Sequence, residues 1–148
     1  MMQGAGLRWA LWTRGVTLGV RTLALDAEGR VLLVRHTYTE GWHLPGGGVD
    51  PGETAGAAAA RELREEAGVE PMGEPELFGL YLQRIAPGRD HVAVYVARRV
   101  RPSGASLDNG EIAETLWATR DALPSGVTRG TRARLAEFFE GAPVSPFW

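Results

Sequence analysis

Short apolar runs, separated by glycine, proline and charged residues, make up most of this chain. Residues 16–25 are rich in β-branched and aliphatic side chains, 26–29 form a turn signal, and 30–34 are a second apolar run. Together these segments predict a β-hairpin. Residues 41–44 predict a short extended piece, which ends at Pro45 and the three glycines that follow it.

Two segments carry helix signals at both ends. Residues 54–67 contain four consecutive alanines and then strong helix formers. Thr54 is placed to cap the start of this helix, and Gly68 is placed to terminate it. Residues 128–140 predict a second helix, which ends at Gly141.

The remaining apolar runs predict strands. Residues 77–85 and 91–100 are two strands joined by a turn over 86–90, and 112–118 are a further short strand after a polar loop over 101–110. Strands therefore come first, followed by a helix, more strands and a last helix. This order predicts an α+β fold, or a helix–sheet–helix sandwich, rather than a regular alternation of strands and helices.

Composition narrows the class of protein. The chain has 148 residues, 44% of them hydrophobic and 23% charged, with a formal net charge of -2, as in an ordinary globular domain. The absence of cysteine excludes disulfides, thiol nucleophiles and cysteine metal sites, and all 16 basic residues are arginine, which excludes a catalytic lysine. We expect one domain over residues 1–148, with an N-terminal extension at 1–14 and a C-terminal tail at 142–148.

Charge and hydropathy also bear on location and partners. Arginines interrupt the N-terminal region, and no uncharged apolar stretch approaches the roughly 18 residues of a membrane span. The near-neutral balance gives no reason to expect a membrane or nucleic acid as partner. We therefore expect a cytoplasmic protein. The aromatic residues near the two ends predict packing on the domain or a homodimer contact: Trp9, Trp12, Phe147 and Trp148.

Candidate chemistry is concentrated on the first predicted helix. Glu62, Glu65 and Glu66 are spaced so that their carboxylates share one helix face near its C-terminal end. Like charges at this spacing destabilise a bare helix, and the helix dipole disfavours anions there. A bound divalent cation would compensate both effects, and oxygen ligands suit Mg²⁺ or Mn²⁺. Arg61 lies four residues before Glu65, within reach to orient its carboxylate.

Glycines precede this helix. Gly46, Gly47 and Gly48 allow close approach of the backbone, and a carbonyl there could complete a coordination sphere. Taken by itself, however, a run of glutamates and arginines after a glycine-rich loop is also typical of a solvated helix face.

The whole segment resembles the signature of the Nudix hydrolase superfamily. The family pattern specifies nine positions, and all of them match here with both gaps correct: Gly47, Glu53 and seven positions of the run 61–69, Arg-Glu-Leu-Arg-Glu-Glu-Ala-Gly-Val, in which Arg64 and Ala67 are unspecified. The segment 47–69 carries five acidic and two basic residues, whereas the rest of the chain has a net charge of +1. The resemblance implies an α/β/α sandwich with a mixed sheet flanked by helices.

The resemblance also implies roles for individual residues. Members of the family hydrolyse a nucleoside diphosphate linked to another group, using Mg²⁺ or Mn²⁺. Their metal-binding glutamates correspond to Glu62, Glu65 and Glu66, and Glu62 could instead act as the base. Glu53 would support the metal, Arg61 would orient the carboxylates, and the Gly46 carbonyl is a further candidate ligand.

Other candidates lie outside the signature. Some family members take a base or an extra ligand from a loop after the late strands, which makes Glu111 the candidate here and Glu114 the weaker alternative. Arg35 and His36 follow the second predicted strand, where they could contact a substrate phosphate. Tyr81 could stack on a nucleobase, but packing in a half-buried β-sheet is the more usual role of such a tyrosine.

The sequence leaves the substrate open. It is compatible with a nucleoside triphosphate, ADP-ribose or a nucleotide sugar as substrate. The alternatives are a Nudix fold that binds a nucleotide with little or no turnover, and an RNA 5′-end pyrophosphohydrolase. The latter would favour a basic surface, which the net charge of -2 does not indicate.

Overall fold

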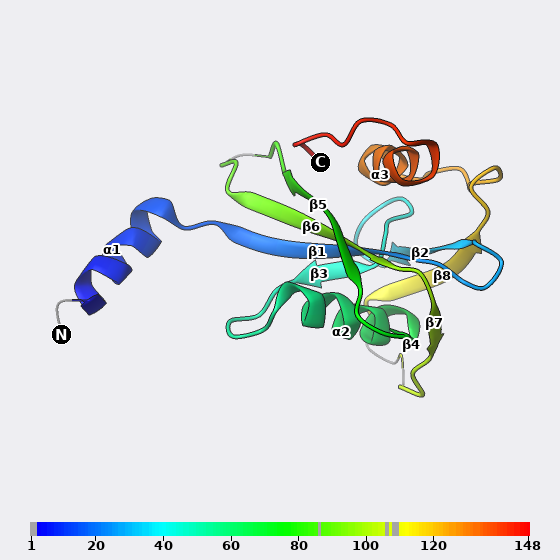
Figure 1. Ribbon diagram of the computed structural model, residues 1–148, viewed down its shortest axis with the longest axis horizontal. Helices are drawn as coiled ribbons and strands as arrows, with labels where there is room; N and C mark the ends of the chain where they lie inside the picture. Colours follow the sequence, from blue (N-terminus) through cyan, green and yellow to red (C-terminus); the bar gives the residue numbers. More distant parts are fainter. Residues whose placement is uncertain (1–2, 86, 106, 108–109) are drawn as a thin grey trace.

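The computed structural model describes residues 3–85, 87–105, 107 and 110–148 (Figure 1). Its central sheet has four strands: β3 (Gly46–Gly48), β1 (Thr17–Ala24), β6 (Asp90–Ala97) and β5 (Glu76–Leu82), in that order. β1 and β6 are parallel, whereas the other two pairs are antiparallel. The sheet is therefore mixed, as the resemblance implied.

Two smaller antiparallel pairs complete the strands. β2 (Val31–His36) pairs with β8 (Ile112–Ala118), and β4 (Val69–Pro71) pairs with β7 (Val100–Pro102). The β2–β8 pair joins the end of the hairpin region to the late loop that precedes Ile112. This pairing brings the segment after β2 next to Glu111.

Helices cover both faces of the central sheet. Figure 1 shows α2 (Ala55–Ala67) and α3 (Arg129–Glu140) on opposite sides of it. Alternation along β1 explains this arrangement, because successive side chains point to opposite faces. Val20 packs against alanines of α2, whereas Leu23 belongs to the cluster that includes Leu135 of α3. The α/β/α sandwich predicted from the sequence is confirmed.

Both predicted helices begin and end where their caps are. The Thr54 hydroxyl accepts a hydrogen bond from the Ala57 backbone N–H, and Gly68 closes α2 with φ of 64°, a conformation that favours glycine. Thr128 and Gly141 cap α3 in the same way. The caps fix the register of α2, and hence which of its side chains face β3.

The predicted hairpin is only partly correct. Residues 25 and 31 form an antiparallel bridge around a tight turn, but β1 and β2 then enter different sheets. Both edges of β1 are taken, by β3 and by the parallel strand β6, so β2 pairs with β8 instead. The sequence shows the turn but not these long-range partners.

Three further elements differ from the prediction. The glycines at 46–48, expected to end an extended piece, form β3 itself. Residues 69–71 form the short strand β4. The N-terminal extension contains a helix, α1 (Gln3–Arg14), that stands apart from the sandwich in Figure 1. Within the described part of the chain, no helix is both long and apolar enough to span a membrane.

Candidate active site

Strand β3 lies directly over the acidic face of α2. A side chain at Gly46 would overlap the backbone of Val20, and one at Gly47 would overlap the Glu62 carboxylate. The first glycine is therefore needed for the pairing of β3 with β1, and the second is needed for the approach of Glu62. Gly48 faces open space.

Arg61 is the centre of an ion-pair network on α2. Its Nε and Nη2 atoms donate to the two carboxylate oxygens of Glu53 at 2.8 and 3.0 Å, and Nη1 donates to Glu62 at 2.8 Å and to Glu65 at 3.2 Å. Nη2 also donates to the Gly48 carbonyl at 3.0 Å. The hydrogen bonds from Arg61 hold the pKa of Glu53 at about 2. Arg61 thus orients three of the carboxylates predicted from the signature.

Glu66 differs from these carboxylates because it is buried. Its residue is only 4% exposed, and the Gly46 backbone N–H donates to Oε1 at 3.4 Å. The other oxygen, Oε2, is buried without a hydrogen-bond partner. Burial and then the negative charge of Glu62 raise the pKa of Glu66, which the positive charge of Arg21 offsets only in part. A carboxylate in this position needs a cationic partner to remain ionised.

His36 lies behind Glu66 rather than at the open surface. Its Nε2 atom is 3.3 Å from Glu66 Oε2, and the residue is 7% exposed. Burial and then the positive charge of Arg21 lower the pKa of His36 to about 4, so the imidazole is neutral near pH 7. This placement suits a side chain that positions Glu66 better than one that contacts a substrate phosphate.

The late loop approaches the site from the β2–β8 side. The Glu111 carbonyl accepts a hydrogen bond from the Thr37 backbone N–H at 2.9 Å, and the Glu111 residue is exposed. Burial raises the pKa of Tyr38, and the negative charges of Glu111 and Glu66 add to this shift. Ile112, the next residue, pairs with His36, whose ring contacts Glu66, so Glu111 adjoins the strand pair that carries His36.

Two predicted substrate contacts have partners elsewhere. Arg35 forms an ion pair with Glu114 across β2 and β8, and its guanidinium lies 6.0 Å from the centre of the Trp42 ring. Tyr81 is fully buried beneath α3, where its hydroxyl donates to Glu137 at 2.7 Å. The structure does not bring Tyr81 to the carboxylate cluster.

The sequence reasoning missed Arg21. This arginine of β1 donates from Nη1 to the Leu44 carbonyl at 2.9 Å, and its charge acts on Glu66 and His36. Burial lowers the pKa of Arg21. One signal could have found it: Arg21 is the one charged residue in the apolar run 16–25.

The donor set fits a hard divalent cation in part. Among the residues that the structure describes, no group of three or more His, Asp or Glu side chains is gathered closely enough to hold a metal ion by itself. Mg²⁺, however, needs few protein ligands, because waters and substrate phosphates complete its shell. The partnerless oxygen of Glu66 beside Glu62 is the feature that such an ion would satisfy.

Fold and site together define an α/β/α sandwich with a carboxylate-rich site, and comparison with known proteins gives the family. The NUDIX domain profile matches residues 15–140, so the chain belongs to the Nudix hydrolases, enzymes that act on acid anhydrides. The crystal structure of a MutT NUDIX hydrolase from Burkholderia pseudomallei superposes with a TM-score of 0.71 at 26% identity, covering 82% of this chain and 97% of that one.

Curated relatives differ in the names they carry. A protein of Bacillus subtilis (strain 168), named as a candidate 8-oxo-dGTP diphosphatase, is 29% identical over 126 residues, which is 85% of this chain and 82% of that protein. Diphosphoinositol polyphosphate phosphohydrolase 2 of Rattus norvegicus is 40% identical over 77 residues, but the match covers only 51% of this chain and 42% of that protein. The relatives share the pyrophosphate-hydrolase family without agreeing on one substrate.

Proposed function

We propose that this chain hydrolyses a pyrophosphate bond in a nucleoside diphosphate-linked substrate, by attack of water and with Mg²⁺ or Mn²⁺. The observation that carries the proposal is the buried Glu66 Oε2 atom, next to Glu62 and beneath β3, which accepts no hydrogen bond although the neutral His36 ring lies 3.3 Å away. A desolvated carboxylate in this setting is costly unless a cation compensates it. The family match supports the same chemistry.

Glu62, Glu65 and Glu66 would hold the ion, with Glu53 in a supporting role and the Gly46 carbonyl as a further ligand. When bound, the ion supplies charge neutralisation of the pyrophosphate and lowers the pKa of a coordinated water. Arg61 holds Glu62 and Glu65 in place through its hydrogen bonds to both. His36 packs behind Glu66 and limits its movement.

A carboxylate of the chain would accept the proton of the attacking water. Glu111 is our first candidate for this role, because its residue is exposed and its neighbour Ile112 pairs with His36, which contacts Glu66. Glu62 is the second candidate. Its ion pair with Arg61 at 2.8 Å holds the Glu62 carboxylate in place.

We place nucleoside triphosphates first among the substrates to test, because the relative named for 8-oxo-dGTP matches most of this chain. ADP-ribose and nucleotide sugars come next, since solved structures with this fold include proteins named as an ADP-ribose pyrophosphatase and a UDP-X diphosphatase. The remaining candidates are a binding module without turnover and an RNA 5′-end pyrophosphohydrolase.

A panel assay tests the proposal. The chain is incubated with nucleoside triphosphates, ADP-ribose, NADH, nucleotide sugars, dinucleoside polyphosphates and capped RNA, with and without Mg²⁺ or Mn²⁺. We expect metal-dependent turnover of at least one compound, and at least a hundredfold loss, on the order of 3 kcal/mol, in Glu66→Gln. The matched control is Glu76→Gln, which removes an exposed carboxylate paired with Arg98. Absence of turnover across the panel would favour the binding module.

A further inference from the structure

Helix α1 presents large apolar side chains to solvent. Leu7 and Leu11 are each 63% exposed, Trp9 is 73% exposed and Trp12 is 84% exposed. Figure 1 shows the helix beyond the start of β1, away from the sandwich. A helix of 12 residues is marginally stable in water without tertiary contacts, so α1 needs a partner that covers these side chains.

The charge of this segment has one sign. Arg8 and Arg14 lie on α1, and the first acidic residue of the chain is Asp26, beyond β1. The segment therefore combines apolar and cationic side chains and carries no carboxylate. A helix with tryptophan, leucine and arginine suits a membrane interface, where indole rings sit at the headgroup level and guanidinium groups reach anionic phosphates.

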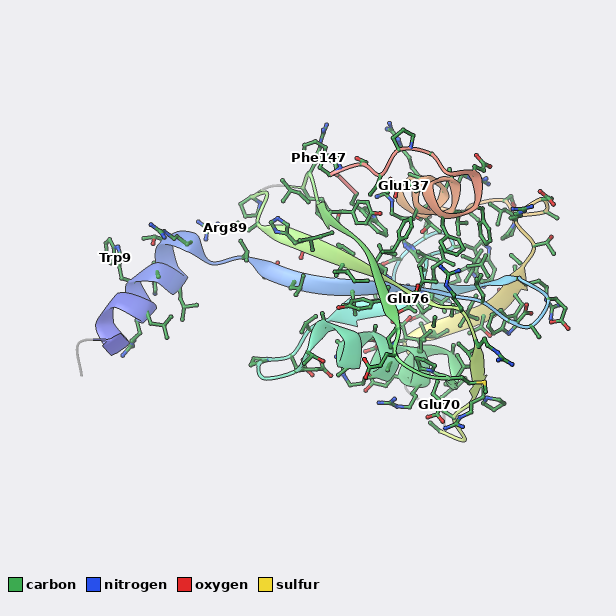
Figure 2. The ribbon with its side chains drawn as sticks, in the orientation of Figure 1. Trp9, Glu70, Glu76, Arg89, Glu137 and Phe147 are labelled. Carbon is green, nitrogen blue, oxygen red and sulfur yellow. The ribbon has the colours of Figure 1, made fainter. Side chains whose placement is uncertain are left out.

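A second segment extends the same surface. The turn between β5 and β6 exposes Arg84, Arg89 and the apolar Ile85, which is 67% exposed. Arg89 donates from Nη1 to the Gly15 carbonyl at 3.1 Å, which links this turn to the end of α1. Figure 2 shows Trp9 and Arg89 at the same end of the molecule. Two segments distant in sequence thus add apolar and cationic side chains to one end.

We propose that residues 7–14 of α1, together with Val16, Arg84, Ile85 and Arg89, form a surface that binds anionic phospholipid membranes peripherally. We call it the α1 surface. Its positive charge is what selects this partner, because an anionic bilayer attracts basic segments while its interface takes up the apolar side chains. The sequence had given no reason to expect a membrane partner, since the whole-chain charge is near neutral; the placement of the arginines changes that expectation. The inference is independent of the proposed hydrolase function.

Vesicle binding by the full chain tests this inference. Binding is measured by co-sedimentation with vesicles of phosphatidylcholine alone and of phosphatidylcholine mixed with phosphatidylglycerol. We expect at least about tenfold more bound chain with the anionic vesicles, a blue shift of tryptophan emission, and loss of binding at high salt. Equal binding to both vesicles, or binding to neither, would overturn the proposal.

Matched variants separate the components of this surface. Trp9→Ala/Trp12→Ala and Arg8→Gln/Arg14→Gln should each reduce anionic-vesicle binding about tenfold or more. Arg98→Gln/Arg101→Gln removes the same charge from exposed ion pairs outside the α1 surface and should bind as the parent chain does. A dimer in solution that dissociates in the tryptophan variant, without vesicle binding by the parent, would assign α1 to a second copy instead and overturn the membrane proposal.

Discussion

The Nε2 atom of His36 lies 3.3 Å from the Oε2 atom of Glu66, with both side chains 5% exposed. The pair connects β2 to the acidic face of α2, beneath the glycine strand β3. His36 thereby fixes the one carboxylate of the cluster that is almost fully buried.

Replacement of His36 should weaken metal binding without removing a proposed metal ligand. In His36→Ala we expect Mg²⁺ affinity to fall by about 10- to 100-fold, the range found when groups that orient metal ligands are removed. Calorimetric titration of Mg²⁺ measures it. His91→Ala, which changes a half-buried histidine of β6, is the control. An unchanged Mg²⁺ affinity in His36→Ala would exclude a positioning role.

Glu66→Gln should separate folding from metal binding. Burial of the Glu66 carboxyl opposes its charged form, so the neutral amide should leave the thermal midpoint of the metal-free chain unchanged or higher. Saturating Mg²⁺ should raise the midpoint of the parent chain, because the ion binds the folded state, and should have little effect on the variant. Scanning calorimetry with and without Mg²⁺ measures both. An equal Mg²⁺ response in the two chains contradicts the metal assignment of Glu66.

Glu111 and Glu114 can be distinguished by pH–rate profiles. If Glu111 accepts the proton from water, Glu111→Gln should lower kcat by about 100-fold or more and abolish the acidic limb of the profile. Glu114→Gln should retain that limb, because the Glu114 carboxylate is engaged by Arg35. An unchanged profile in Glu111→Gln removes Glu111 as the base and makes Glu62 the next candidate.

The raised pKa of Tyr81 leads us to expect a loss of stability at high pH. Burial and the hydrogen bond to Glu137 raise the pKa of Tyr81 above its ordinary value of about 10. Below about pH 10 the phenol is protonated in both the folded and the unfolded chain, so its contribution to the free energy of unfolding is fully present. As the pH rises further, the unfolded chain ionises before the folded one, and this contribution is lost.

Thermal melts of the parent chain and of Tyr81→Phe measure this effect. At about pH 8 the parent should be the more stable by about 1 to 3 kcal/mol, the contribution of a hydrogen bond to a charged group. The difference in stability should shrink between about pH 10 and 11. A difference that is independent of pH would show that the phenol does not titrate differently in the two states.

Local signals were sufficient for α2 and α3 and for the contacts of Arg61 within α2. Thr54 and Gly68 mark the ends of α2, and its register then follows from the sequence alone. The spacing of Glu62, Glu65 and Glu66 therefore predicted their shared face correctly, and Arg61 pairs with Glu65 as expected. Each of these relationships lies within one helix, where spacing determines proximity.

Contacts between segments distant in the sequence could not be predicted from local patterns. β3 contains only glycine, which has low strand propensity, and it forms because β1 offers it an edge. Arg21 and His36 come from two different strands. Only the tertiary fold brings the charge of Arg21 and the imidazole ring of His36 close to Glu66. The sequence left Tyr81 either stacking on a nucleobase or packing in the sheet, and its buried contact with Glu137 on the α3 side follows only from the tertiary fold.

The three glycines of β3 are chemically identical, yet the structure gives each a different tolerance to replacement. Any side chain at Gly46 meets the backbone of Val20, so no substitution should be recovered there in a saturation library selected for folding. A side chain at Gly47 meets only the end of Glu62, so small residues should survive selection for folding but not for turnover. Gly48 faces open space and should accept many residues. One such library would therefore distinguish the glycine that folding requires from the one that turnover requires and from the one that neither requires.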